Sequence, residues 1–183
     1  MEHMSDFIII VDLEATCCDR GGVPREEMEI IEIGAVAAEV STGKAVSEFQ
    51  SFVRPVRHPV LTPFCRKLTT IEQAEVDAAD IYPTVVDRFR DWLSAWSESD
   101  FGSWGDYDRR QFEQDCAFHD VEFPFNGAHR NVKKEAAKRM KLRKPLGVGV
   151  VLSKLGMEFE GTAHRGIDDV RNIARICARV LCS

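Results

Sequence analysis

The stretch Phe7-Ile-Ile-Ile-Val-Asp-Leu-Glu14 determines the centre of the predicted fold. Its first five residues are an apolar, mostly β-branched run, long enough for a buried strand and too short for a helix. Asp12 and Glu14 follow at once, and residues two apart in an extended chain project to the same face. We therefore predict a central strand that aims two carboxylates at one point near its carboxyl end, where α/β sheets place their sites.

Outward from this strand, the pattern predicts a sheet with helices around it. Residues 29–40 and Phe49–Val53 read as two further strands of a meander, joined by a turn at Ser41–Lys44, and Phe101–Trp104 reads as a brief strand. Helical patterns are expected at Thr70–Ala78, after Pro83, at Asp108–His119, through the basic segment 130–144, at Val148–Leu155 and at Ile167–Leu181. The fold class is therefore α/β, with a central mixed sheet flanked by helices.

Size and composition favour one intracellular domain. The chain has 183 residues, 44% of them hydrophobic, which suits a single domain over residues 1–183 with a core at about 7–181. No apolar run approaches the roughly 18–20 residues of a membrane span, and the segment Met1–Met4 lacks the features of a secretory signal. The six cysteines include no Cys-x-x-Cys pair, so we expect reduced thiols and a cytoplasmic protein without membrane partners.

The charge is distributed unevenly along the chain. The net charge is −6, yet the segment 130–144 carries eight basic residues and one acid, Glu135. This asymmetry is typical of a flank that binds a nucleic-acid backbone beside an acidic centre. The alternative interpretation is a solvated helix face.

Two other segments carry candidate chemical groups. In Trp104-Gly-Asp-Tyr-Asp108, both Asp106 and Asp108 compete for a role; the first could be a turn residue and the second a helix N-cap. In His164-Arg-Gly-Ile-Asp-Asp169, the histidine is expected to precede the helix, and it could take a proton from water near neutral pH. The spacing does not choose between Asp168 and Asp169. A lone histidine, like an isolated Asp-x-Glu, is more often structural than catalytic.

Together, these weak signals fall at the ends of three predicted elements. Clustered carboxylates repel one another unless a cation lies between them, and Mg²⁺ or Mn²⁺ prefers oxygen ligands. Four carboxylates and a histidine are the groups that a two-metal phosphodiesterase needs.

These three motifs resemble those of the DnaQ-like, DEDDh superfamily of 3′-5′ exonucleases. The stretches Phe52–Pro55, Leu61–Cys65, Leu68–Ile71 and Lys154–Met157 are also similar to the enhanced-RNAi, histone-mRNA 3′-end exoribonuclease type. The resemblance runs from about Phe7 to Leu181 and implies a ribonuclease-H-like fold.

The resemblance also implies roles for single residues. It assigns two Mg²⁺ (or Mn²⁺) ions to Asp12, Glu14, Asp108 and Asp169, and the role of general base to His164. It places Ala15, Thr16, Phe64 and Tyr107 at the pocket for the terminal nucleotide, although the subfamily often has tryptophan at the position of Tyr107. An aromatic ring there can stack on any base.

We therefore expect a metal-dependent 3′-5′ exonuclease that acts on single-stranded 3′ ends, releases 5′-monophosphates and prefers RNA. The alternatives are the same reaction on DNA and a non-catalytic nucleic-acid-binding module. A dinucleotide-cofactor enzyme is excluded, because Leu152 stands where a Gly-x-Gly-x-x-Gly loop starting at Gly147 needs its third glycine.

Overall fold

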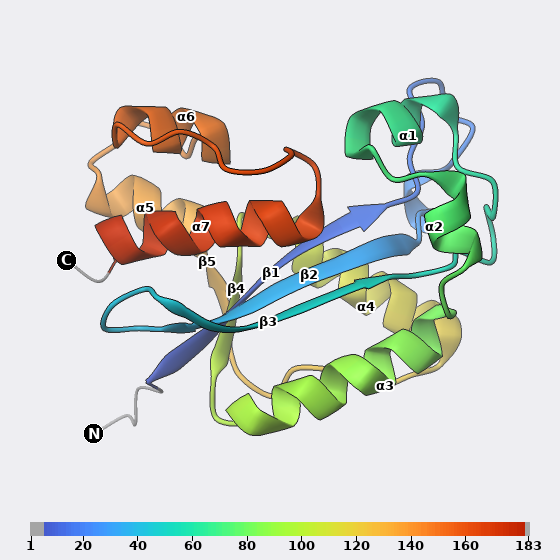
Figure 1. Ribbon diagram of the computed structural model, residues 1–183, viewed down its shortest axis with the longest axis horizontal. Coiled ribbons are helices and arrows are strands. Elements are labelled where there is room, and N and C mark those ends of the chain that lie inside the picture. Colours follow the sequence, from blue (N-terminus) through green and yellow to red (C-terminus); the bar gives the residue numbers. More distant parts are fainter. Residues whose placement is uncertain (1–5, 182–183) are drawn as a thin grey trace.

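A five-stranded mixed sheet forms the centre of the computed structural model, which describes residues 6–181 (Figure 1). The strands are β1 (Phe7–Ala15), β2 (Ile30–Glu39), β3 (Ala45–Phe52), β4 (Asp100–Ser103) and β5 (His129–Asn131). Their order is β3-β2-β1-β4-β5. The first three strands form the predicted antiparallel meander, whereas β4 pairs in parallel with both β1 and β5.

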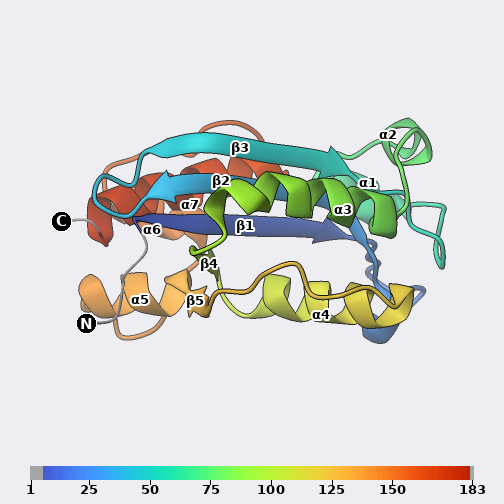
Figure 2. The same cartoon turned by 90° about the horizontal axis from the view of Figure 1, so that it is seen from below.

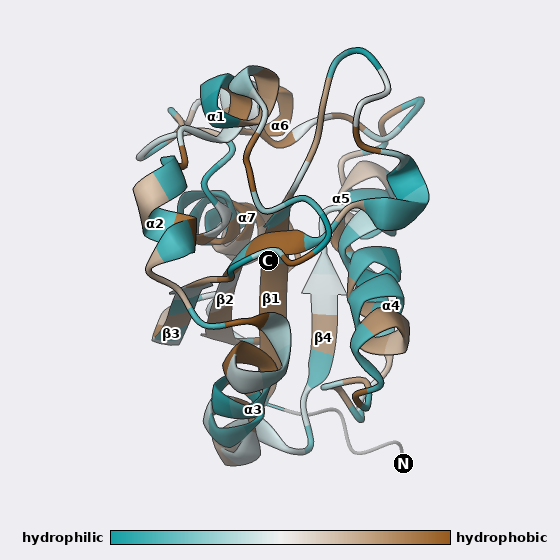
Figure 3. Cartoon of the chain, turned by 90° about the vertical axis from the view of Figure 1, so that its right-hand side faces the viewer, coloured by the Kyte–Doolittle hydropathy of each residue, from teal (hydrophilic) through white to brown (hydrophobic). Residues whose placement is uncertain are grey.

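Helices cover both faces of this sheet, with α3 in front of it and α7 behind it in Figure 2. The helices are α1 (Pro63–Thr69), α2 (Gln73–Asp77), α3 (Tyr82–Leu93), α4 (Tyr107–His119), α5 (Val132–Arg139), α6 (Val148–Lys154) and α7 (Gly166–Val180). Two short 3-10 turns lie at Arg25–Glu27 and Ser94–Trp96. In Figure 3, apolar residues gather on β1 and β2 at the centre, whereas α4 at the outside is largely polar.

The alternation of side chains along β1 divides the core in two. Ile9, Val11 and Leu13 are buried against α3 and α4, whereas Ile8 and Ile10 are buried against α7. Each fully buried side chain of this size contributes roughly 1.5–3 kcal/mol. Since β1 continues to Ala15, beyond the predicted end of the strand, the next side chains in the row that faces α7 are carboxylates.

Two predicted helices were wrong in their extent. Thr70 does not begin a helix; it ends α1 with a left-handed φ of 60°, and α2 is instead capped by Glu72 and Glu75. The basic segment 130–144 is not one helix, because its first residues pair with β4 as part of β5. Helix α5 then ends at Arg139, well before Pro145.

Helix α1 was not predicted, whereas α4, α6 and α7 agree with their predicted ranges to within a residue and α3 begins beside Pro83 as expected. The pattern of α7 predicts an apolar stripe at Val170, Ile173, Ala174, Cys177 and Leu181; the first four are buried, and Leu181 is half-buried just past the end of the helix. Of the cysteines expected to be reduced, Cys182 lies outside the described residues. None of the helices in the described part of the chain is long and apolar enough to cross a membrane.

Candidate active site

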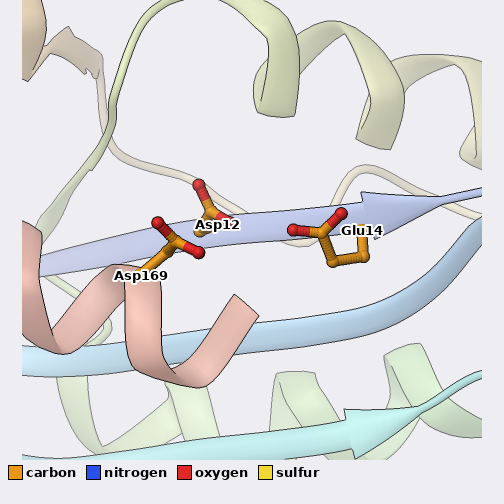
Figure 4. Close-up of side chains that lie close together, drawn as sticks. All are labelled: Asp12, Glu14 and Asp169. Atoms are coloured by element: carbon orange, nitrogen blue, oxygen red, sulfur yellow. The ribbon is translucent and has the colours of Figure 1, made fainter. Parts of the chain in front are cut away.

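Three carboxylates meet on the face of the sheet that α7 covers. Asp12 and Glu14 project from β1, and Asp169 points toward them from the first turn of α7 (Figure 4). One carboxylate oxygen from each residue lies within 4.8 Å of the other two. The period of two along β1 therefore continues from the core directly into the site.

The start of α7 determines which of its two aspartates joins this cluster. Asp168 turns away: it accepts a hydrogen bond from the Thr162 backbone N–H at 2.9 Å and pairs with Arg171 at 3.1 Å. Asp169 accepts the His164 backbone N–H at 2.7 Å and also faces β1. The geometry thus separates two residues that the spacing alone had left equivalent.

The start of α4 makes a similar separation between Asp106 and Asp108. Asp106 accepts a hydrogen bond from the Asn131 side chain at 2.9 Å and pairs with Lys134. Asp108 is 4% exposed, and its carboxylate accepts the Leu13 backbone N–H at 3.1 Å. Its side chain is therefore fixed to β1 between the two acidic residues of that strand, rather than capping its own helix.

Burial and mutual repulsion control the charge of these acids. Burial, and after it the charges of Asp169 and Glu32, together raise the pKa of Glu14 from 4.5 to about 9. The pKa of Asp12 is also raised well above its usual range, first by burial and then by Asp108 and Asp169. For Asp108, burial raises the pKa to about 6, although the Leu13 N–H opposes the change. A divalent cation would remove both causes, since it supplies opposite charge and replaces lost hydration.

His164 lies on the wall of the same pocket, before α7 begins, as predicted. Its backbone has a left-handed φ of 62°, a conformation that costs free energy for a residue with a side chain. The hydrogen bond to Asp169 holds the backbone there, and the imidazole side is exposed to solvent. The histidine is therefore fixed at its main chain and accessible at its ring.

A cavity of about 350 Å³ opens over these groups. Its lining comprises Asp12, Leu13, Glu14, Ala15, Cys17, Met28, Leu68, Trp104, Tyr107, Asp108, Val148, His164 and Asp169. Two of the residues predicted for a nucleotide pocket, Ala15 and Tyr107, are among them. Thr16 is buried, with its hydroxyl accepting the Glu29 backbone N–H, and Phe64 lies one turn before Leu68 on α1. Neither belongs to the lining, and their predicted role stays a prediction.

Apart from Ala15 and Tyr107, the apolar residues of the lining were not predicted from the sequence. Leu68 and Trp104 lie within stretches that carried the resemblance, so their neighbourhood was a usable signal. Met28 and Val148 reach the pocket only through the tertiary fold. The helices that carry Leu68 and Val148, α1 and α6, lie on the same side of the molecule in Figures 1 and 3.

Comparisons with known proteins identify the family to which the chain belongs. The RNase_T exonuclease family model matches residues 9–177. Human 3'-5' exoribonuclease 1 is 35% identical over 187 residues, which cover 96% of this chain and 52% of that protein. Human ERI1 exoribonuclease 2 is 32% identical, over 98% of this chain and 29% of that protein. The chain therefore spans about half or less of the length of these relatives.

The solved structures give the same result for the fold. The nuclease domain of 3'hExo, described as a DEDDh family member bound to rAMP, is similar with a TM-score of 0.89 and 32% identity, covering 99% of this chain and 94% of that one. This agreement confirms the predicted ribonuclease-H-like fold, and such exonuclease folds imply divalent metal ions. With its family match over most of the chain and its acidic site in place, the protein belongs to the DEDDh group of the exonuclease family.

Proposed function

We propose that this chain hydrolyses single-stranded nucleic acid from the 3′ end, releases 5′-monophosphates and prefers RNA. The observation that carries the proposal is the cluster of Asp12, Glu14 and Asp169, whose oxygens converge within 4.8 Å. Asp108 and His164 complete the set on the wall of one open cavity. This combination supports phosphodiester hydrolysis better than a binding role, because binding alone would not need repelling acids beside a free histidine.

The acidic cluster fits divalent cations. Its ligand atoms are all carboxylate oxygens, which Mg²⁺ and Mn²⁺ prefer. Asp12, Glu14, Asp108 and Asp169 would hold two such ions, preferably Mg²⁺. When bound, the ions would stabilise the negative charge that develops on the scissile phosphate.

The remaining chemistry belongs to the protein's own groups. His164 would accept a proton from the attacking water at its ring, because its main chain is fixed and its side chain faces the cavity. Asp169 would keep the histidine in place through the 2.7 Å bond to the His164 backbone N–H. The position of the base and the position of one acidic ligand are therefore coupled.

The apolar wall of the cavity would receive the terminal nucleotide. Tyr107 is 39% exposed, and the Arg25 guanidinium lies 4.8 Å from the centre of its ring, which restrains the ring at the rim. Leu68 is 37% exposed on α1. Flat or apolar side chains of this kind stack on a base without reading its sequence. Ala15 would contact the nucleotide from β1, with Thr16 and Phe64 supporting this wall from behind and beside it.

The preference for RNA is supported by the relatives, two of which are named exoribonucleases. A similar structure with a TM-score of 0.89 is described as recognising the 3′ end of a histone mRNA stem-loop. Discrimination from DNA would depend on contacts with the 2′-hydroxyl. The same reaction on DNA is the alternative that the experiment below separates.

The basic segment 130–144 would guide the strand toward the cavity. Arg130 is occupied by Glu135 and Lys134 by Asp106. The other six basic side chains of the segment form no ion pair within residues 6–181. The segment ends close to the cavity, since the Trp104 indole N–H donates to the Leu146 carbonyl at 3.0 Å. Contacts with phosphates here would weaken as salt rises. The cytoplasmic location stays a prediction.

Digestion of 5′-labelled, single-stranded RNA and DNA of one sequence tests the proposal. With Mg²⁺, we expect a ladder that shortens from the 3′ end, faster on RNA, and no digestion in EDTA. Faster digestion of DNA would establish the alternative substrate. Binding of both strands without shortening, in Mg²⁺ and in Mn²⁺, would contradict the proposed reaction and favour a binding module.

A further inference from the structure

We infer that Glu32 is a positioning residue for the proposed reaction: it fixes the first turn of α7 and thereby places Asp169 and His164 in the site. Glu32 lies on β2 directly opposite Glu14 of β1. The inference rests on the proposed function for its effect on rate, but its structural part can be measured separately.

The Glu32 carboxylate connects α7 to the edge strand β3, through Gln50 on the same face of the sheet. Its side chain is fully buried. One oxygen accepts the Gly166 backbone N–H at 3.1 Å and the Arg165 side-chain N–H at 3.3 Å. The other oxygen accepts the Gln50 side-chain N–H at 3.0 Å. Since Gly166 is the first residue of α7, the carboxylate holds the helix by its N-terminus, where a negative charge is favourable.

A second contact on the same face of β2 fixes how closely the helix can approach. A Cβ atom on Gly34 would lie 2.2 Å from the Gly166 carbonyl carbon, so the main chains of β2 and α7 touch there. Glu32 and Gly34 are two residues apart and therefore share this face. One attracts the first turn of α7, and the other allows it to lie against the sheet. Together they determine how closely the first turn of α7 approaches the sheet and where along β2 it lies.

Asp169 follows Gly166 by about one turn, so a shift of the first turn moves its carboxylate by a similar amount. His164 would move as well, because its backbone N–H is bonded to Asp169. Displacements of about 1 Å in a catalytic group can cost on the order of 10²-fold in rate.

Glu32 itself is distinct from the candidate metal ligands. Among the described residues, the group of converging ligand atoms contains Asp12, Glu14 and Asp169 and does not include it. Its two oxygens already accept three hydrogen bonds from protein groups. Its charge is partly balanced by Arg165. The residue therefore acts through α7, and not by contact with the substrate.

The test compares Glu32→Gln and Glu32→Asp with Gln50→Ala as the matched control. Glu32→Gln removes the negative charge that pairs with Arg165 and attracts the N-terminus of α7. Glu32→Asp keeps the charge but is one methylene too short to reach Gly166. For both, we expect a fall in kcat on the order of 10²-fold with little change in KM. Hydrogen–deuterium exchange should become faster at residues 164–169. Gln50→Ala removes only the bond on the sheet side, so it should keep kcat and the exchange of that segment near wild type.

Three results would overturn the inference: wild-type kcat in both Glu32 variants, a slower kcat with unchanged exchange at residues 164–169, or an equal loss in Gln50→Ala. If Glu32→Gln does not fold, Glu32→Asp decides between the same outcomes. An inactive wild-type protein would instead contradict the proposed function, while the exchange comparison, together with Mn²⁺ binding measured by calorimetry, would still test whether Glu32 positions the segment.

Discussion

Two groups of buried acids, centred on Glu14 and on Glu29, differ in what surrounds them. Glu29 is 2% exposed and accepts three backbone N–H bonds from residues 56–58, at 2.7 to 3.1 Å. Glu14 is 9% exposed, and within the described residues its carboxylate accepts no hydrogen bond. Its neighbours are other acids. Glu29 holds a loop together, whereas Glu14 has surroundings that only a cation would satisfy.

The same difference appears in the pKa values of acids near each centre. Near Glu29, burial raises the pKa of Asp115 to about 7, and bonds from Gln111 and the Ile30 N–H oppose the change. At Glu14, the pKa reaches about 9 because like charges add to burial. Burial of an acid is therefore not itself a sign of function; burial with like charges and without donors is.

The largest expected effect is on catalysis, and it comes from making the same substitution, glutamate to glutamine, at Glu14 and at Glu29. Glu14→Gln removes a candidate carboxylate ligand, so we expect kcat for oligonucleotide digestion to fall by at least ~10²-fold. Mutation of a residue that only supports a metal ligand already costs about 10–100-fold in activity. Glu29→Gln should keep kcat near wild type, measured well below its unfolding temperature. Equal losses of activity in both variants would break the comparison.

Stability should change in the opposite sense. In Glu29→Gln, the amide nitrogen cannot accept, so at least one backbone N–H of residues 56–58 loses its partner. The free energy of unfolding should fall by ~1–3 kcal/mol. Glu14→Gln removes the free-energy cost of protonating this acid on folding above its ordinary pKa of 4.5, so it should raise the unfolding free energy of the metal-free protein. Urea unfolding in EDTA measures both, and a destabilised Glu14→Gln variant would argue against the raised pKa of this acid.

Divalent ions should stabilise the wild-type protein and Glu29→Gln, and much less so Glu14→Gln. A ligand that binds only the folded state adds about 2.7 kcal/mol at 100 times its Kd. Thermal unfolding with increasing Mn²⁺ measures the shift. If Mn²⁺ raises the unfolding temperature of Glu14→Gln as much as that of wild type, Glu14 is not a ligand of the ion.

The pH dependence of the metal-free protein sharpens the comparison further. The folded-state pKa of Glu14, about 9, lies above its ordinary 4.5. Between these values the folded state binds the proton and the unfolded state has lost it, so stability falls as pH rises from about 4.5 to about 9. Unfolding in EDTA at pH 5, 7 and 9 should show this fall. The slope should be smaller in Glu14→Gln; an unchanged slope would assign it to other groups.

The smallest effect is expected at Asp106, an acid two residues from Asp108 that has partners on the protein surface. Asp106→Asn keeps an acceptor for Asn131 and loses the ion pair with Lys134, together with the 3.9 Å pair with His129 when that ring is protonated. Exposed pairs contribute less than ~1 kcal/mol, so stability should change little and kcat should stay at the wild-type value. A loss of activity comparable with that of Glu14→Gln would place Asp106 in the site.

The sequence predicted those parts of the molecule that depend on local periodicity. The β-branched run of β1 was sufficient to predict a strand, and the apolar stripe of α7 was sufficient to predict a helix. A buried strand and an amphipathic helix each repeat their pattern over several residues. The prediction of one helix over segment 130–144 was wrong because the first residues of the segment belong to the edge strand of the sheet, and no local pattern reveals that contact. Thr70 was misplaced because helix capping and a left-handed helix end favour similar polar residues.

The candidate site, too, was predictable only where it depends on local periodicity. The shared face of Asp12 and Glu14 follows from the strand period. The choices between Asp106 and Asp108, and between Asp168 and Asp169, depend on where a helix starts, which the spacing does not fix, so in the sequence only the resemblance to the family made them. Glu32 gave no signal, because its partner Gly166 lies 134 positions away.

Calorimetric titration of Mn²⁺ into the metal-free wild type, Glu14→Gln and Glu29→Gln tests the central distinction most directly. If the acids around Glu14 exist to hold cations, wild type and Glu29→Gln will bind with the same stoichiometry and similar affinity, and Glu14→Gln will lose at least one ion or bind far more weakly. Binding to Glu14→Gln that matches wild type would contradict the account.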